Sequence, residues 1–186
     1  MNKQHLDFCS SDEWAESLRR YIIPGALEGV ALGDDVLEVG PGPGRTTDLL
    51  RTMAPQLTAV EIDPDLADAL AQRMAGTNVT VVRADATDLP FEDGRFSAAV
   101  SFIMLHHVPT PGQQDELFRE VARVLRPGGV LAGCDSLDTP DFRAMHEDDV
   151  CVPVPPDTLA RRLSAAGFSD VQVDPNPYVV QFRATK

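Results

Sequence analysis

The sequence is poor in cysteine and in basic residues, and it contains no long apolar run. Cys9, Cys134 and Cys151 lie far apart with no C-x-x-C pair, which argues against a disulfide framework and a zinc knuckle. Lys and Arg number 16 against 29 Asp and Glu, and the resulting net charge of -13 disfavours nucleic acid as a substrate. No apolar run reaches the roughly 20 residues of a membrane span, and the N-terminus lacks a signal-peptide layout. We therefore expect a cytoplasmic protein with reduced thiols.

The length and composition indicate one domain. A chain of 186 residues with 43% hydrophobic residues can bury one sizeable core, and it is short for two. We predict a single domain over residues 1–186. Residues 1–30 would form an N-terminal helical cap, and residues 135–156 would form a short variable segment. The leading helix is predicted over Ser11 to Ile23, with Ser10 or Ser11 as N-cap and Pro24-Gly25 as its end.

Short β-branched runs alternate with helical patterns through most of the chain. This alternation predicts β-α-β units, and hence an α/β fold with a parallel sheet covered by helices on both faces. Near the C-terminus, runs over 171–173 and 178–182 are separated by only four residues, which predicts an antiparallel pair. The predicted parallel strands are Val36 to Val39, Leu57 to Ile62, Val79 to Arg83, Ala98 to Phe102 and Val130 to Cys134. The predicted helices start at Asp63-Pro64, carry Leu49 to Met53 and Leu117 to Leu125, and span Asp157 to Ala166.

A glycine-rich loop follows the first predicted strand, with the sequence Glu-Val-Gly-Pro-Gly-Pro-Gly over residues 38–44. Glycines let a ligand approach the backbone at the start of a helix, although a tight turn without a ligand is the alternative. Glu61 ends the second strand about twenty residues later, where an acid can accept hydrogen bonds from both ribose hydroxyls. Residues 83–86 and 101–107 follow two further strands and point to the same crevice. The pattern predicts a ligand that contains a nucleoside.

Five motifs follow one another along the chain: Glu38 to Gly44, Val60 to Asp63, Asp85 to Phe96, Met104 to Val108 and Leu125 to Val130. In this order they resemble the class I S-adenosylmethionine-dependent methyltransferases, especially the type 11 small-molecule branch that is similar to ubiquinone and menaquinone biosynthesis methyltransferases. The resemblance covers most of the chain. It implies a Rossmann-like, seven-stranded, mostly parallel sheet with a C-terminal antiparallel hairpin, and methyl transfer from S-adenosylmethionine with S-adenosylhomocysteine as product.

The resemblance also implies which residues bind the cofactor. The loop would lie under the methionine portion, Glu61 would hold the ribose, and Asp85 with the Ala86 backbone would contact the adenine edge. Ser101 and Phe102 would border the point of methyl transfer. The cofactor-binding residues expected from it are Glu38, Gly40, Pro41, Gly42, Gly44, Glu61, Ile62, Asp85, Ala86, Ser101 and Phe102.

Methyl transfer from a sulfonium is an in-line displacement, so alignment matters most and a general base is optional. His106 and His107 are the candidate catalytic residues, because histidine titrates near neutrality. The alternative is that one packs against the cofactor or a helix and the other faces solvent. No metal is expected, because the acids and histidine of residues 146–149 are consecutive in a polar connector that we take for a solvated loop. Trp14 and Tyr21 could cover the cofactor or simply pack.

Two other functions remain open from the sequence. A nicotinamide-dependent oxidoreductase also places glycines before a helix, and a catalytically silent S-adenosylmethionine-binding regulatory protein would keep the same loop. We expect a small-molecule acceptor and a monomer or homodimer. The sequence identifies neither the acceptor nor the atom that is methylated, and it does not decide between the two oligomeric states. The short segment over residues 135–156 suggests a shallow pocket, a small acceptor or completion by another subunit.

Overall fold

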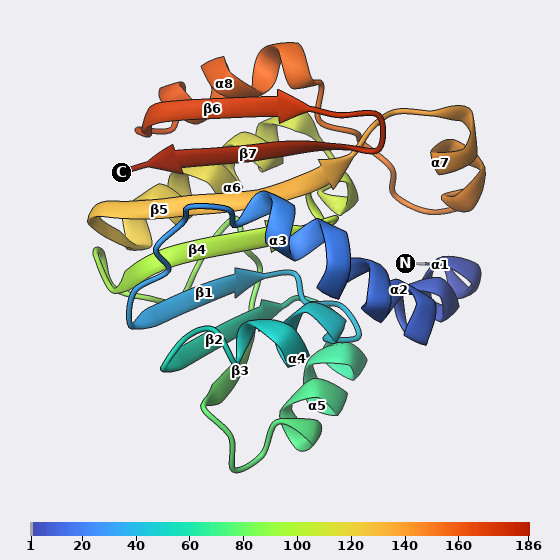
Figure 1. The fold of residues 1–186 in the computed structure, drawn as a ribbon, viewed down its shortest axis with the longest axis horizontal. Coiled ribbons are helices and arrows are strands. Elements are labelled where there is room, and N and C mark those ends of the chain that lie inside the picture. The colour runs from blue at the N-terminus through green and yellow to red at the C-terminus, as the bar shows by residue number, and fades with distance from the viewer. Residues whose placement is uncertain (1) are drawn as a thin grey trace.

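The computed structural model describes residues 2–186, which form one seven-stranded sheet with helices on both faces (Figure 1). The strand order is β3-β2-β1-β4-β5-β7-β6, and β7 runs antiparallel to both of its neighbours while the remaining pairs are parallel. This confirms the predicted α/β class, the seven strands and the C-terminal hairpin. The strands are β1 (Asp35–Val39), β2 (Gln56–Glu61), β3 (Val79–Arg83), β4 (Phe96–Phe102), β5 (Leu125–Ser136), β6 (Ser169–Pro175) and β7 (Val179–Thr185).

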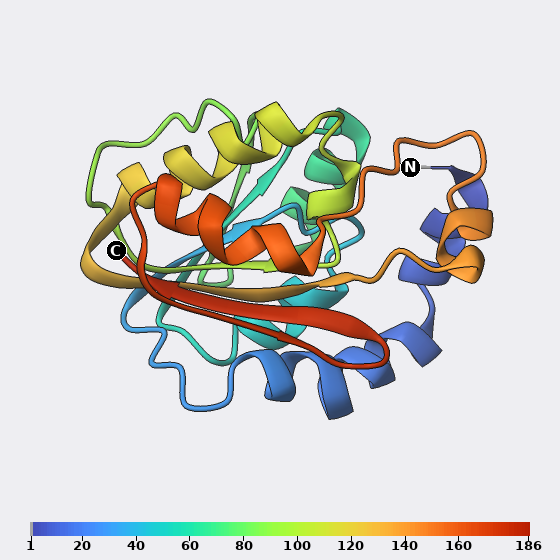
Figure 2. The ribbon, with the colours of Figure 1, turned by 90° about the horizontal axis from the view of Figure 1, so that it is seen from above.

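The sheet separates two apolar cores. Because side chains alternate along a strand, neighbouring residues of β1 enter different cores: Leu37 packs with the helices of one face and Val36 with those of the other. Helices α6 (Pro111–Val124) and α8 (Pro156–Ala165) cover the first face, and α3 (Ile23–Ala26) and α4 (Arg45–Leu50) cover the second (Figure 2). Such two-sided burial explains the nearly continuous apolar runs of the central strands.

Two predicted helix ends differ from the structure. The leading helix is capped by Ser11 as predicted, but its end at Pro24-Gly25 is wrong: α2 (Asp12–Ser17), a π-helical turn (Leu18–Ile22) and α3 follow one another to Ala26. Pro24 lies in the first turn of α3, where a missing N–H costs little. Helix α4 ends at Leu50, so Met53 lies outside it and is 47% exposed.

Two further helices lie outside these two cores, one against β2 and β3 and one beyond the carboxyl ends of the central strands. Helix α5 (Pro64–Arg73) begins at the predicted N-cap Asp63, whose carboxylate accepts from the amides of Asp65 and Leu66. Helix α1 (Lys3–Cys9) was not predicted. It lies beyond the carboxyl ends of the central strands, close to α7 (Pro140–Met145), as both views show (Figures 1 and 2). Within residues 2–186, none of the helices has the length and apolar character to span a bilayer.

Candidate active site

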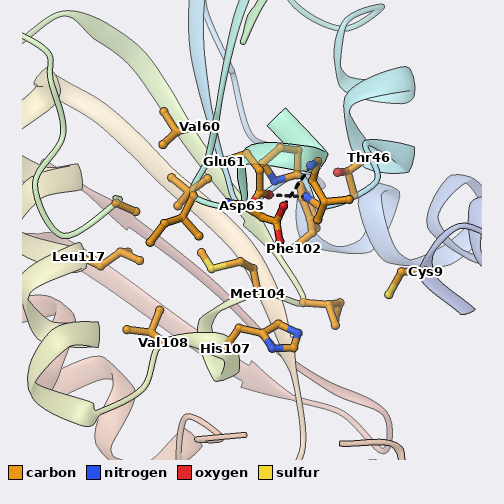
Figure 3. Close-up of a pocket in the computed structure, with 18 of the residues that line it drawn as sticks. Cys9, Thr46, Val60, Glu61, Asp63, Phe102, Met104, His107, Val108 and Leu117 are labelled. Atoms are coloured by element: carbon orange, nitrogen blue, oxygen red, sulfur yellow. Dashed lines mark hydrogen bonds between the residues drawn. The ribbon is translucent and has the colours of Figure 1, made fainter. Parts of the chain in front are cut away.

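A cavity of about 470 Å³ opens at the carboxyl ends of the central strands, where an open α/β sheet binds its ligands. The glycine loop, the ends of β2, β3 and β4, and the start of α6 form its walls (Figure 3). The structure therefore brings most of the predicted cofactor residues and one candidate catalytic residue into one cavity. The predicted residues that line it are Gly40, Pro41, Gly42, Glu61, Ile62, Asp85, Ala86, Phe102 and His107.

The loop at the floor of this cavity depends on its glycines. Gly40, Gly42 and Gly44 have φ values of 67°, 54° and 80°, in the left-handed region that side chains disfavour. A Cβ on Gly40 would lie 2.1 Å from Cγ of Met104, which also lines the cavity. The Gly40 amide donates to the carbonyl of Val60 at 2.9 Å, so the loop is fastened to the neighbouring strand. A ligand can thus contact the backbone of a fixed turn.

Glu61 connects this loop to the end of β2. Its Oε2 accepts a hydrogen bond from the Gly42 amide at 2.9 Å, and its Oε1 accepts one from the Asp63 amide at 3.0 Å (Figure 3). The side chain is 6% exposed, yet it lines the cavity. A carboxylate has about four acceptor positions, so two hydrogen bonds leave capacity for hydroxyl donors from a ligand.

Glu38 lies beneath the loop and outside the cavity wall. It is 1% exposed, and its carboxylate accepts hydrogen bonds from the hydroxyls of Thr46 and Thr47 at the start of α4. Burial raises the pKa of the Glu38 carboxyl to about 7, although the two hydroxyl hydrogen bonds oppose this shift. In the described structure Glu38 therefore supports the loop from below. Gly44 and Ser101 also lie outside the wall.

Asp85 forms the rim of the cavity at the end of β3. Its Oδ1 accepts hydrogen bonds from the amide of Thr87 at 2.9 Å and from the Thr87 hydroxyl at 2.8 Å. The side chain is exposed, and Ala86 beside it is half-buried. The carboxylate of Asp85 contrasts with the apolar side chains of Met104 and Leu117, which also line the cavity.

The two candidate catalytic histidines have different environments, and neither extends into solvent. His106 is fully buried: Nδ1 lies 2.5 Å from Oδ1 of Asp135, and its backbone amide donates to Oδ2 at 3.0 Å. It lies behind the cavity wall. His107 lines the cavity, and burial, with the adjacent His106 and His5, lowers the pKa of its ring to about 3. A neutral imidazole of such low basicity is a poor proton acceptor near pH 7.

All four histidines of the chain meet in one group, which we call the histidine cluster: His5, His106, His107 and His146. One ring nitrogen from each lies within 4.8 Å of the others. The expectation of a solvated loop over residues 146–149 is wrong for His146, which is 4% exposed. It follows α7 and packs against α1, two elements that the sequence patterns did not reveal. The cluster has no sequence signature, because its members come from three distant segments.

The structure also adds cavity residues that the motifs did not assign to the cofactor. Asp63 and Leu66 come from the start of α5, Trp14 from α2, and Asp149 from the segment after α7. Trp14 lines the cavity and also packs against Phe8 and the second core, whereas Tyr21 is 70% exposed and does not line the cavity. Aromatic spacing alone does not distinguish these two positions, because both lie on the same leading helix.

The fold and the cavity define an α/β domain that binds a nucleoside ligand at its strand ends. Residues 37–133, which are 97 of the 186 residues, match the methyltransferase domain family. The chain therefore belongs to the class I S-adenosylmethionine-dependent methyltransferases, as the five motifs indicated. S-Adenosylmethionine is the methyl donor of this family.

Individual relatives are distant and longer. The chain is 30% identical over 123 residues to a demethylmenaquinone methyltransferase of Clavibacter sepedonicus, covering 66% of this chain and 46% of that protein. It is 34% identical over 143 residues to a fatty-acid O-methyltransferase of Mycolicibacterium smegmatis, covering 72% and 51%. The chain thus spans about half the length of these relatives. The DhpI-SAM-HEP complex has a similar fold, with a TM-score of 0.74, 23% identity, and coverage of 96% of this chain and 90% of that one.

Proposed function

We propose that this chain transfers a methyl group from S-adenosylmethionine to a small-molecule acceptor. The observation that carries the proposal is the hydrogen bond between Glu61 and the Gly42 amide, in the wall of a cavity that is also lined by apolar side chains. The carboxylate offers acceptors for ribose hydroxyls. The backbone of the glycine loop lines the cavity and can contact the methionine portion there.

The cavity suits in-line displacement more than proton transfer. S-Adenosylmethionine supplies an activated methyl group on its sulfonium when bound. Phe102 and Met104 border the centre of the cavity and can hold an acceptor against the methyl group at near-attack distance (Figure 3). The lowered pKa of His107 favours a role in positioning the acceptor over one as a general base.

The acceptor end indicates a molecule with an apolar part. Met104, Val108 and Leu117 line the cavity, pack in one apolar cluster and have little hydrogen-bonding capacity. The named relatives act on demethylmenaquinone and on fatty acids, both of which carry long apolar portions. We therefore extend the proposal to an acceptor that places an apolar group against this wall.

Calorimetric titration tests the cofactor first, with S-adenosylmethionine, S-adenosylhomocysteine and NAD offered in parallel. We expect micromolar binding of the two sulfur nucleosides and none of NAD. Incubation with methyl-labelled S-adenosylmethionine and a panel of quinols, sterols and fatty acids then tests transfer. Binding of NAD alone would contradict the proposal, and cofactor binding without transfer to any acceptor would favour the silent regulatory protein.

A further inference from the structure

The histidine cluster contains four ring nitrogens that have no hydrogen-bond partner. Among residues 2–186, the buried side-chain atoms without a partner include Nδ1 of His5 and Nε2 of His106, His107 and His146. Each histidine therefore contributes one such atom, and one ring nitrogen of each histidine lies within 4.8 Å of the others. A buried polar atom without a partner is costly, so four of them together need an explanation.

The other ring nitrogens of two members fix which nitrogen carries a proton. Nδ1 of His106 donates to the Asp135 carboxylate at 2.5 Å, and Nδ1 of His146 donates to the carbonyl of Phe142 at 2.7 Å. In the neutral ring this leaves a lone pair on each Nε2. A metal-binding histidine usually donates its second ring nitrogen to a carboxylate or a backbone carbonyl in this way. The cluster thus has both the ligands and the groups that orient them.

The backbone around the cluster is built to bring these rings together. The side chain of Asn2 accepts from the His5 amide at 2.8 Å, which starts α1. The same side chain donates to the carbonyls of Met145 at 2.9 Å and Glu147 at 3.0 Å, on either side of His146. One asparagine therefore joins two segments that lie about 140 residues apart in the chain. The ring centroids of His5 and His146 are consequently 4.3 Å apart.

We propose that the histidine cluster binds one divalent transition metal of the zinc class and thereby ties helix α1 to the wall of the cofactor cavity. Imidazole nitrogens suit zinc and its neighbours, and four nitrogen ligands match the closed tetrahedral geometry of a structural zinc site. With bonds of about 2.05 Å, the ligand nitrogens of such a site lie about 3.3 Å apart. In the structure these ring nitrogens lie within 4.8 Å of one another. Ring movements of about an ångström or two would bring them to the separation of a metal site.

The histidine cluster adjoins the cavity. Because His107 also lines the cavity, a bound metal would hold one part of the cavity wall in place.

The test uses the full chain produced without a histidine tag. The metal content is measured by elemental mass spectrometry, and the metal-free protein is titrated with Co²⁺ and then Zn²⁺ while visible absorption is recorded. We expect one metal per chain, a Co²⁺ spectrum typical of tetrahedral nitrogen ligands, and its loss on addition of Zn²⁺. Bound Zn²⁺ should also raise the unfolding temperature, because a ligand of the native state stabilises that state.

Matched variants locate the site. His146→Gln and His5→Gln should each weaken Co²⁺ binding by on the order of 100-fold or more, since even residues that only orient ligands contribute about 10- to 100-fold. Cys9→Ser, on the same helix as His5, should leave affinity unchanged and excludes a thiolate ligand. Circular dichroism checks the fold of each variant. If His146→Gln does not fold, the Co²⁺ affinity of His5→Gln provides the test.

Absence of stoichiometric metal binding by the unaltered chain would overturn this assignment, as would full affinity in a folded histidine variant. The result is independent of the proposed methyl transfer. Metal binding with no binding of S-adenosylmethionine would contradict the proposed function alone, whereas cofactor binding with no metal would contradict only the metal site.

Discussion

Replacing Glu61 with alanine should weaken S-adenosylmethionine binding while leaving the domain folded. In the structure its carboxylate accepts hydrogen bonds from the amides of Gly42 and Asp63, at 2.9 and 3.0 Å. About two of its four acceptor positions remain for the ribose hydroxyls. The substitution therefore removes the ribose acceptors and also releases one support of the glycine loop.

The size of the effect follows from hydrogen bonds to a charged group, which contribute about 1.5 to 3 kcal/mol. Loss of that free energy raises the dissociation constant by about 10- to 150-fold. Glu61→Gln should have an intermediate effect, because the amide keeps the volume and one acceptor oxygen. Calorimetric titration with S-adenosylhomocysteine measures all three proteins without turnover.

A matched control separates this contact from the loss of one negative charge. Asp68→Ala removes an exposed acid of α5 that does not line the cavity. The affinity of this variant for S-adenosylhomocysteine should equal that of the unaltered chain. If folded Glu61→Ala bound the nucleoside within about twofold of the unaltered chain, against the expected loss of at least 1.5 kcal/mol, the ribose assignment would be refuted.

Two further predictions concern the loop and its support. Gly40→Ala should lower the free energy of unfolding by about 1 to 3 kcal/mol more than Gly76→Ala in urea titrations. Both glycines have positive φ, but only a Cβ at Gly40 would meet Met104, so equal losses would contradict the close packing. Glu38 has a raised pKa of about 7 in the folded state, so its stabilising contribution is complete below pH 4.5 and is lost as pH rises through 7. The stability of the unaltered chain relative to Glu38→Gln, measured in urea at pH 5.5 and pH 8, should therefore fall by about 2 kcal/mol between the two pH values; a constant difference would contradict the shift.

The central strands could be predicted because local pattern and tertiary environment agree there. All five parallel strands were located, since burial on both faces requires unbroken β-branched runs. The ends of helices were less predictable. Pro24 is a strong stop signal, but it falls in the first turn of a new helical segment where its missing donor is tolerated. Helix α1 escaped prediction because only His5 and Cys9 of its seven residues are buried, which is too few for a periodic pattern.

Some residues of the candidate site could likewise be predicted from the sequence, and others could not. The glycine loop and Glu61 could be found because their chemistry depends on short spacings within one β-α-β unit. Glu38 belongs to the same motif, yet its carboxylate bonds to Thr46 and Thr47 and so faces away from the cavity. The sequence does not indicate this orientation, since both positions are compatible with an acid at the end of a strand. The acidic neighbours of His146 predict a solvated loop. Its burial results from the packing of the segment after α7 against α1, which the sequence does not indicate.

Asp135 explains how the sheet and the histidine cluster depend on one another. It follows Cys134 near the end of β5, is fully buried, and accepts hydrogen bonds from His106 at both the ring and the backbone amide. The antiparallel pairing of β5 with β7 extends through Asp135 and Ser136, so the last strand of the chain fixes the position of this carboxylate. Because the carboxylate orients the His106 ring, the C-terminal hairpin contributes to the geometry of a cluster that contains His5 from the first helix. The geometry of the histidine cluster therefore depends on completion of the sheet, although the residues involved lie at opposite ends of the sequence.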